Sequence, residues 1–212
     1  TYVVAYELHR MGGESPVSQV VELMKRLGVA KDFFDAVEKL RSMAEEGATG
    51  IILDLRSNPG GLLDVVVSVA SHFLKEGVVV DVMDNDGKHT TSTVKPGGMT
   101  IDLPMVVLVD SYTASGGEVL AGALRDNGRA ILAGTKTFGK GSVNVLHRLK
   151  DGSGLYLTTA RWFTPNGNLI EGKGIEPDIE LGLDWEEAIQ WAIDYLKRGE
   201  YETAPVPKLW YG

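Results

Sequence analysis

The spacing of hydrophobic positions predicts alternating strands and helices, most regularly from about residue 50 onward. Short runs of consecutive apolar or β-branched residues are typical of strands covered on both faces, and apolar residues three and four positions apart predict helices. The predicted strands cover residues 2–8, 50–55, 78–82, 105–109, 130–133, 143–149 and 154–163. The predicted helices cover residues 17–27, 33–47, 62–75, 117–126 and 184–198. This alternation favours an α/β fold with a mainly parallel sheet.

Polar, glycine-rich segments separate these elements. The longest lies between the strands at 78–82 and 105–109 and contains Asn85-Asp86-Gly87, which predicts turns and loops there. Asp184 followed by Glu187 has the pattern of a capping box, so we expect the last helix to begin at that aspartate.

Composition excludes several classes of protein. The 212 residues are 43% hydrophobic and 24% charged, with a net charge of −8 and no long run of like charges. Nucleic acid and anionic membrane surfaces are therefore poor partners, and no apolar segment is long enough to span a bilayer. The absence of cysteine removes thiol catalysis, disulfides and cysteine-ligated zinc. No histidine shows metal-ligand spacing, so we expect neither a metal nor a cofactor.

One candidate for chemistry is Ser115, in the loop Thr113–Glu118 between a predicted strand and a predicted helix. A helix N-terminus favours developing negative charge, and the N–H of Gly116 would be a natural oxyanion donor. The alternative is that Ser115 only caps the helix, as serine commonly does. The glycine pattern is also not that of a nucleophile elbow, which would need glycine in place of Thr113.

A second candidate is Lys140, within Gly134–Ser142. Residues Gly134–Lys140 match most of the phosphate-binding pattern, but Gly141 replaces the metal-binding hydroxyl and a strand follows instead of a helix, which disfavours a nucleotide site. A lysine serves as general base only when its amine is neutral, and burial favours that form. The alternative is a solvated loop lysine, which is the usual state of lysines, whereas Phe138 and the flanking glycines favour a buried amine.

Two further candidates remain open on the residues alone. The turn Arg56–Gly61 follows a strand, and Gly60 and Gly61 permit close backbone approach to a ligand, but a purely structural turn is an equal alternative. His147 as the base of a Ser-His-Asp triad is a weaker alternative, because triads occur in several chain orders.

Together, four segments resemble the carboxy-terminal processing (tail-specific) serine proteases, peptidase family S41. The order and spacing match from about residue 31 to residue 198. The segments are Leu53–Leu62, Thr113–Glu118, Gly134–Val143 and Tyr156–Asp178.

The resemblance implies a Ser–Lys endopeptidase that cleaves proteins near their C-termini through an acyl-enzyme. Ser115 falls on the nucleophile, Lys140 on the general base, and Gly116 with Gly60 or Gly61 on the oxyanion donors. Asp126 matches a supporting acidic position or serves as a helix-end residue. Asn144 occupies the position at which the family often has a glutamine that orients the lysine. The asparagine side chain is one methylene shorter than glutamine.

The resemblance also implies a core of the crotonase/Clp-like spiral type at residues 31–200, a C-terminal tail at 201–212, and protein substrates with apolar C-terminal tails. Family members usually carry a PDZ domain, and the sequence contains no complete one. Residues 1–30 are expected to form a strand and a helix, which are either ordinary elements or the remnant of a PDZ domain. Members act in the bacterial envelope or the thylakoid lumen. A catalytically weak, tail-binding member and, less well supported, a nucleotide-binding protein remain the alternatives.

Overall fold

The computed structural model describes residues 4–7, 42, 48–96 and 102–199. The predicted helix at 17–27 lies outside the described residues, as does the one at 33–47 apart from Ser42, which is helical. The predicted tail at 201–212 and most of the suggested PDZ remnant also lie outside them.

A five-stranded sheet has the order β1-β2-β5-β6-β9. Its three central strands are made of residues that the sequence predicts as strands buried on both faces. The bounds are β1 Val4–Glu7, β2 Ile51–Asp54, β5 Met105–Val109, β6 Ile131–Gly134 and β9 Ile179–Glu180. Only the β1–β2 pairing is antiparallel. The prediction of a mainly parallel sheet is therefore confirmed for this part of the fold.

A second sheet is entirely antiparallel and has the order β4-β3-β8-β7. Its strands are β3 Val78–Asp84, β4 His89–Thr93, β7 Ser142–Arg148 and β8 Gly154–Phe163. The prediction of loop for the polar stretch after β3 was wrong over β4. This strand reads His-Thr-Thr-Ser-Thr and lies at the edge of the sheet, where exposed side chains leave no hydrophobic alternation to detect.

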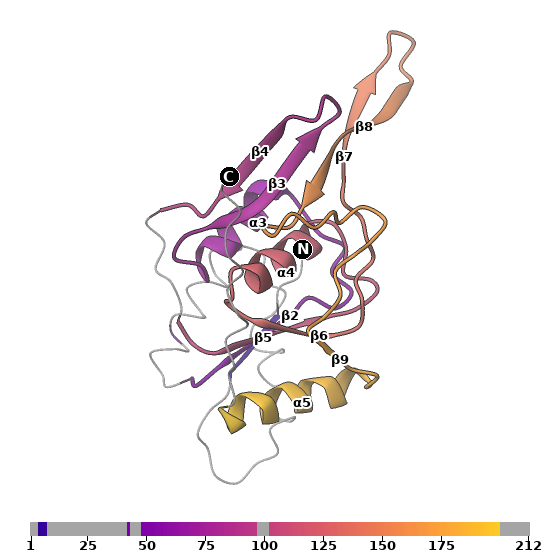
Figure 1. The fold of residues 1–212 in the computed structure, drawn as a ribbon. Helices are drawn as coiled ribbons and strands as arrows, with labels where there is room; N and C mark the ends of the chain where they lie inside the picture. Colours follow the sequence, from indigo (N-terminus) through magenta and orange to yellow (C-terminus); the bar gives the residue numbers. More distant parts are fainter. Residues whose placement is uncertain (1–3, 8–41, 43–47, 97–101, 200–212) are drawn as a thin grey trace.

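The helices and sheets stack as layers (Figure 1). Helices α3 (Leu63–Ser71) and α4 (Gly116–Asp126) lie between the two sheets, and α5 (Trp185–Arg198) covers the opposite face of the parallel sheet. Alternate strand residues divide between the two cores: Leu53 and Val107 pack with α3 and α4, whereas Ile52 and Val106 pack with α5. This is the period-2 alternation expected of a strand buried on both faces.

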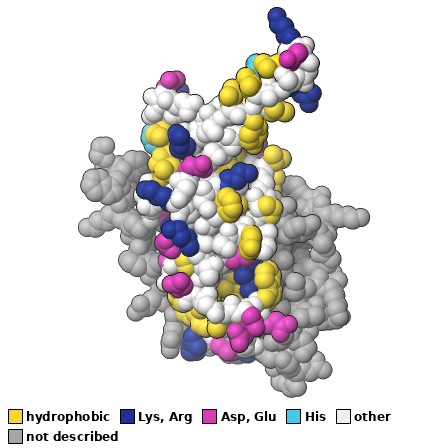
Figure 2. Space-filling view, turned by 90° about the vertical axis from the view of Figure 1, so that its right-hand side faces the viewer, with side chains coloured by type: hydrophobic (Ala, Val, Ile, Leu, Met, Phe, Trp, Pro, Cys, Tyr) yellow, Lys and Arg dark blue, Asp and Glu magenta, His cyan; other side chains and the backbone are white. Residues whose placement is uncertain are grey.

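The β7–β8 hairpin projects from the body of the molecule as an arm (Figure 1). Strand pairing places Val145 opposite Leu157 and Leu146 opposite Tyr156, and neighbouring positions face opposite sides of a strand. All four side chains are exposed, and hydrophobic side chains are visible along the arm in Figure 2. The arm therefore carries apolar side chains on both faces.

Helix α5 is attached to the loop after β2 through Arg56. The Arg56 guanidinium lies 3.7 Å from the centroid of the Trp185 ring, and its Nη1 donates to the Trp185 carbonyl oxygen at 3.0 Å. Arg56 also forms an ion pair with Asp54 at 2.6 Å, and both side chains are largely buried. The start of α5 is thereby tied to the loop that continues to Gly60 and Gly61.

We expect Trp185→Leu to lower the free energy of unfolding by about 1 kcal/mol, the contribution typical of an exposed to partly buried cation–π pair. Leucine retains apolar bulk but lacks the aromatic face, and the bond to the backbone carbonyl remains available. Urea unfolding of the two proteins measures the difference. Equal stabilities would show that the stacked arrangement of Arg56 and Trp185 contributes nothing.

No helix among the described residues is both long and apolar enough to cross a membrane.

Candidate active site

Ser115 stands at the junction between β5 and α4 in a strained conformation. Its φ of 55° and ψ of −120° lie outside the regions that non-glycine residues normally occupy. Such strain costs about 1–3 kcal/mol and persists only where the surrounding structure imposes it. The strand–turn–helix arrangement is that of a nucleophile elbow, although the glycine pattern of that motif is absent.

Ordinary helix capping does not explain this conformation. N-cap residues normally have extended backbone dihedral angles. Asp184, which begins α5, is of that kind: its φ is −70°, its ψ is −179°, and its carboxylate accepts hydrogen bonds from the N–H groups of Glu186 and Glu187. The capping box predicted for α5 is thus confirmed. Ser115 occupies the corresponding position of α4 with a different backbone.

The turn containing Gly60 and Gly61 packs directly against the serine loop. A Cβ atom added to Gly60 would lie 2.6 Å from the Gly116 nitrogen and 2.8 Å from the Ser115 Cβ. A Cβ added to Gly116 would lie 3.0 Å from the Gly61 nitrogen. The structure therefore brings together the three glycines predicted from the sequence to be oxyanion donors, and their lack of side chains permits the contact.

Hydrogen bonding distinguishes Gly60 from Gly61. The Gly60 N–H donates to Asn58 Oδ1 at 2.9 Å, whereas the N–H groups of Gly61 and Gly116 have no hydrogen-bond acceptor among the residues that the structure describes. Free N–H groups on adjacent backbone segments are suited to stabilise a negatively charged oxygen. Gly61 is accordingly the better candidate of the two for a second donor.

Glu118 links the serine loop to the lysine loop and is not among the site residues predicted from the sequence. This side chain is fully buried. Its Oε2 accepts from the backbone N–H groups of Ser115 at 2.9 Å and Lys140 at 2.8 Å. Its Oε1 accepts from the Thr137 hydroxyl at 2.6 Å and the Gly139 N–H at 2.7 Å. One carboxylate thus makes neighbours of the two candidate residues.

A sequence signal for part of this arrangement exists. Serine followed three residues later by glutamate, before an apolar run, is the capping-box pattern, and Ser115 and Glu118 have it. That pattern predicts the bond from the serine N–H to the glutamate. It contains no information about the contacts with residues 137–140, because those residues approach only in the folded chain.

The expectation of a buried lysine amine was wrong for this structure. Lys140 is exposed, and Phe138, which was expected to cover it, is 65% exposed. The backbone of this segment is nonetheless firmly held, since Gly139 is buried and the Phe138 N–H donates to the Thr113 carbonyl oxygen at 3.0 Å. The predicted strand after the lysine is confirmed as β7, which argues against a phosphate-binding loop.

The structure does not bring the two predicted supporting side chains onto the candidate pair. The side-chain Oδ1 of Asn144 accepts from the Thr158 hydroxyl at 2.7 Å, and the side-chain Nδ2 donates to the Ser142 hydroxyl at 3.1 Å. Asp126 lies at the far end of α4, about 16 Å from Ser115 at roughly 1.5 Å per helical residue. There it forms an ion pair with Arg125 and accepts from the Asn166 N–H.

The remaining candidate, His147, is not supported by the geometry. His147 lies on the exposed outer half of β7, five residues beyond the start of that strand at Ser142. Among the described residues, no three His, Cys, Asp or Glu side chains are placed to share a metal ion.

A strained serine between a strand and a helix, close to glycine N–H groups that have no acceptor among the described residues, is the arrangement expected of a serine peptidase. The model of peptidase family S41 matches residues 17–181, and this chain belongs to that family. The resemblance stated from the sequence is thereby confirmed.

The relatives of the chain are processing proteases. It is 44% identical over 193 residues to a carboxyl-terminal-processing protease of Synechocystis sp., covering 85% of this chain and 45% of that protein. It is 34% identical over 185 residues to carboxyl-terminal-processing peptidase 1 of Arabidopsis thaliana chloroplasts, covering 87% and 37%. The chain thus spans less than half the length of these relatives.

A solved structure supports the fold assignment. The photosystem II D1 C-terminal processing protease superposes with a TM-score of 0.67 at 34% identity, over 81% of this chain and 44% of that one. The prediction of an α/β core of the S41 type is therefore confirmed.

Proposed function

We propose that this chain is the catalytic core of a serine endopeptidase that cleaves proteins near their C-termini, with Ser115 as nucleophile and Lys140 as general base. The observation that carries the proposal is the Glu118 carboxylate, whose single Oε2 atom accepts from the backbone N–H groups of both residues. A nucleophile and its base must lie within reach of each other, and a shared acceptor for their backbone N–H groups supports that pairing.

The proposed reaction has two halves. The Lys140 amine accepts the Ser115 hydroxyl proton while Oγ attacks the scissile carbonyl, and the N–H groups of Gly61 and Gly116 bind the developing oxyanion. The protonated amine then gives its proton to the leaving amine, which leaves an acyl-enzyme on Ser115. Water, deprotonated by the same lysine, releases the acid product. Because Lys140 is exposed, we expect bound substrate to cover the amine and exclude water around it.

The substrate class rests on the relatives, which are named for carboxyl-terminal processing. We propose unstructured protein segments with apolar C-terminal tails as substrates, and the bacterial cell envelope as the place of action. Supporting roles for Asp126 and Asn144 are proposed only through the elements they hold, namely the end of α4 and the start of β7.

A weakly catalytic, tail-binding protein is the second candidate function. It is favoured by the exposed Lys140 and by the engagement of Asn144 with Thr158 and Ser142. Turnover separates the two functions, since both would bind peptide tails.

The test follows an unstructured protein with an apolar C-terminus under conditions that trap the acyl-enzyme. We expect wild type to cleave it and to show a transient mass increase on the peptide containing Ser115. Ser115→Ala should show neither, and Lys140→Ala should form the adduct far more slowly. Undiminished cleavage by Ser115→Ala would overturn the proposed nucleophile. Peptide binding without any turnover by wild type would favour the second candidate.

A further inference from the structure

The two loops that meet at the candidate site share an unusual backbone feature. Ser57 and Ser115 both have a φ of 55°, and they are the two non-glycine residues with positive φ among the described residues. A positive φ of this kind strains a non-glycine residue, at a cost of about 1–3 kcal/mol. Something in the surrounding structure must therefore hold each of them. For Ser115, Glu118 accepts its N–H, but Glu118 has no hydrogen bond with Ser57.

Asp110, the residue after β5, is the side chain that holds Ser57. Its Oδ1 accepts from the Ser57 N–H at 2.9 Å, and its Oδ2 lies 3.4 Å from the Ser57 hydroxyl. The same Oδ1 accepts from the N–H groups of Tyr112 at 3.0 Å and Thr113 at 2.9 Å. The last two bonds form a local Asx turn, whereas the first joins segments 53 residues apart in the chain.

Other bonds show that the two loops are connected as one unit at this point. The Thr113 hydroxyl donates to the Leu55 carbonyl oxygen at 2.8 Å and accepts from the Asp110 N–H at 3.0 Å. The Ala114 N–H donates to the Asn58 carbonyl oxygen at 2.8 Å. Thr113 and Asn58 are both buried. The distance between the turn at Gly60 and the serine loop is therefore set by a few hydrogen bonds that converge near Asp110.

We propose that Asp110 is a positioning residue for the oxyanion site: its carboxylate sets the Gly61 N–H against the Gly116 N–H by clamping Ser57 to the serine loop. This inference rests on the proposed function, because it assigns a purpose to the two glycine N–H groups. A carboxylate suits the task since it only accepts hydrogen bonds, and its charge strengthens bonds from N–H groups. Asparagine could keep the Oδ1 bonds, without the charge.

The first measurement is steady-state hydrolysis by wild type, Asp110→Asn and Asp110→Ala. We expect kcat to fall by about tenfold or more in Asp110→Ala, with KM little changed, because a misplaced oxyanion donor weakens the transition state and not the bound substrate. Asp110→Asn should lie between wild type and Asp110→Ala.

The second measurement compares two ligands of the same sequence: a peptide aldehyde, which forms a tetrahedral adduct with a serine, and the corresponding peptide amide. Asp110→Ala should weaken binding of the aldehyde by about tenfold more than it weakens binding of the amide. Urea unfolding identifies any variant that fails to fold. If Asp110→Ala does not fold, the comparison is made with the isosteric variant Asp110→Asn.

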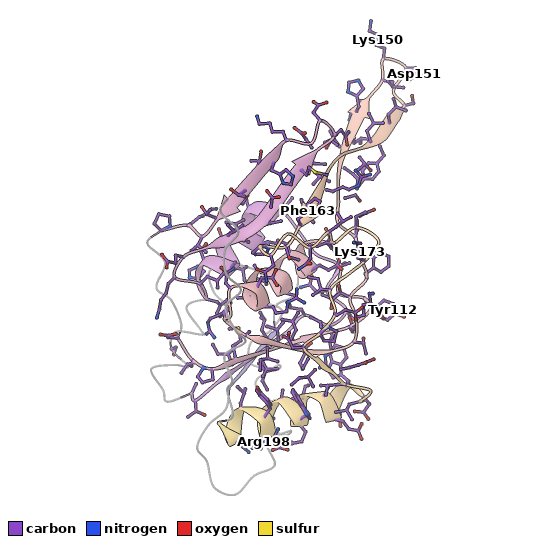
Figure 3. The ribbon with its side chains drawn as sticks, viewed as in Figure 1. Tyr112, Lys150, Asp151, Phe163, Lys173 and Arg198 are labelled. Atoms are coloured by element: carbon purple, nitrogen blue, oxygen red, sulfur yellow. The ribbon has the colours of Figure 1, made fainter. Side chains whose placement is uncertain are left out.

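The matched control is Asp151→Ala. Asp151 also forms an Asx turn, accepting from the Ser153 N–H at 3.0 Å and the Ser153 hydroxyl at 2.6 Å. It lies at the tip of the β7–β8 arm, remote from Tyr112 beside Asp110 (Figure 3). We expect this variant to keep the wild-type kcat and ligand preference.

Equal weakening of aldehyde and amide by the Asp110 variants would overturn the proposal, because it would indicate a general structural role. Unchanged kcat would also overturn it. The proposed function fails in a different way, through cleavage by Ser115→Ala or through a wild type that forms no aldehyde adduct.

Discussion

Gly60→Ala is expected to abolish detectable peptide hydrolysis and to lower the free energy of unfolding by several kcal/mol. Gly60 has a φ of +95°, and its added Cβ would lie 2.6 Å from the Gly116 nitrogen and 2.7 Å from the Ala114 carbonyl oxygen. Both are backbone atoms of the serine loop, so neither can rotate away. The turn must move outward, and the Gly61 and Gly116 N–H groups then no longer converge. Loss of one oxyanion donor alone costs about 10²–10³ in kcat.

Gly152→Ala provides the control for backbone strain. Gly152 has a similar φ of +88°, but nothing lies within 4 Å of its added Cβ. Its substitution should cost only the roughly 1–2 kcal/mol of a left-handed L-residue and leave kcat unchanged. Urea unfolding and initial rates of the two variants separate strain from collision. If both variants hydrolyse peptide equally well, the close approach of the two loops has no part in catalysis.

Glu118→Gln should lower the free energy of unfolding by about 3 kcal/mol and reduce kcat by roughly a hundredfold. The carboxylate accepts two hydrogen bonds at each oxygen in a fully buried position. The side-chain NH₂ of glutamine is a donor, so it would face two of these donor groups and leave them without an acceptor. Each unsatisfied buried polar group costs about 1–3 kcal/mol. The backbones of Ser115 and Lys140 would then shift, and a misplacement of about 1 Å can cost 10²-fold in rate.

Glu187→Gln is the matched control for that change. Glu187 occupies the same third position of a helix, in the capping box of α5, but it is exposed. Among the described residues its carboxylate accepts only from the Asp184 N–H, at 3.2 Å. Exposed substitutions of this kind usually change stability by less than about 0.5 kcal/mol. Similar stabilities for the two glutamine variants would show that the Glu118 bonds are not what holds the loops together.

The regular elements could be predicted because their information is local. Apolar runs and helical spacing identify β5 at its exact bounds, α4 to within one residue and β8 exactly. Strand β4 could not be predicted, since its polar residues lie on an exposed edge where burial imposes no pattern. Short strand β9 escaped for a related reason: two residues are too few to show a period.

The candidate site divides in the same way. Glycine loops at strand–helix junctions mark Ser115, Gly60 and Gly61 in the sequence, because backbone conformation demands glycine at a close approach. Which glycine N–H is free depends on the Asn58 side chain, and the neighbourhood of Lys140 depends on Glu118. The exposure of Lys140 also depends on which residues cover it. Patterns in the local sequence do not predict these contacts, because the contacts join residues that are far apart in the chain.

The sequence by itself thus determined the α/β core, the family, and the loops in which the chemistry of a serine peptidase would reside. Only the tertiary structure decided how these loops meet: through Asp110, which joins the Gly60 turn to the serine loop, and through Glu118, which joins that loop to Lys140. The physical reason is the range of the interactions. Propensity and burial patterns act over a few residues, whereas one buried carboxylate can hold together donors that lie far apart along the chain.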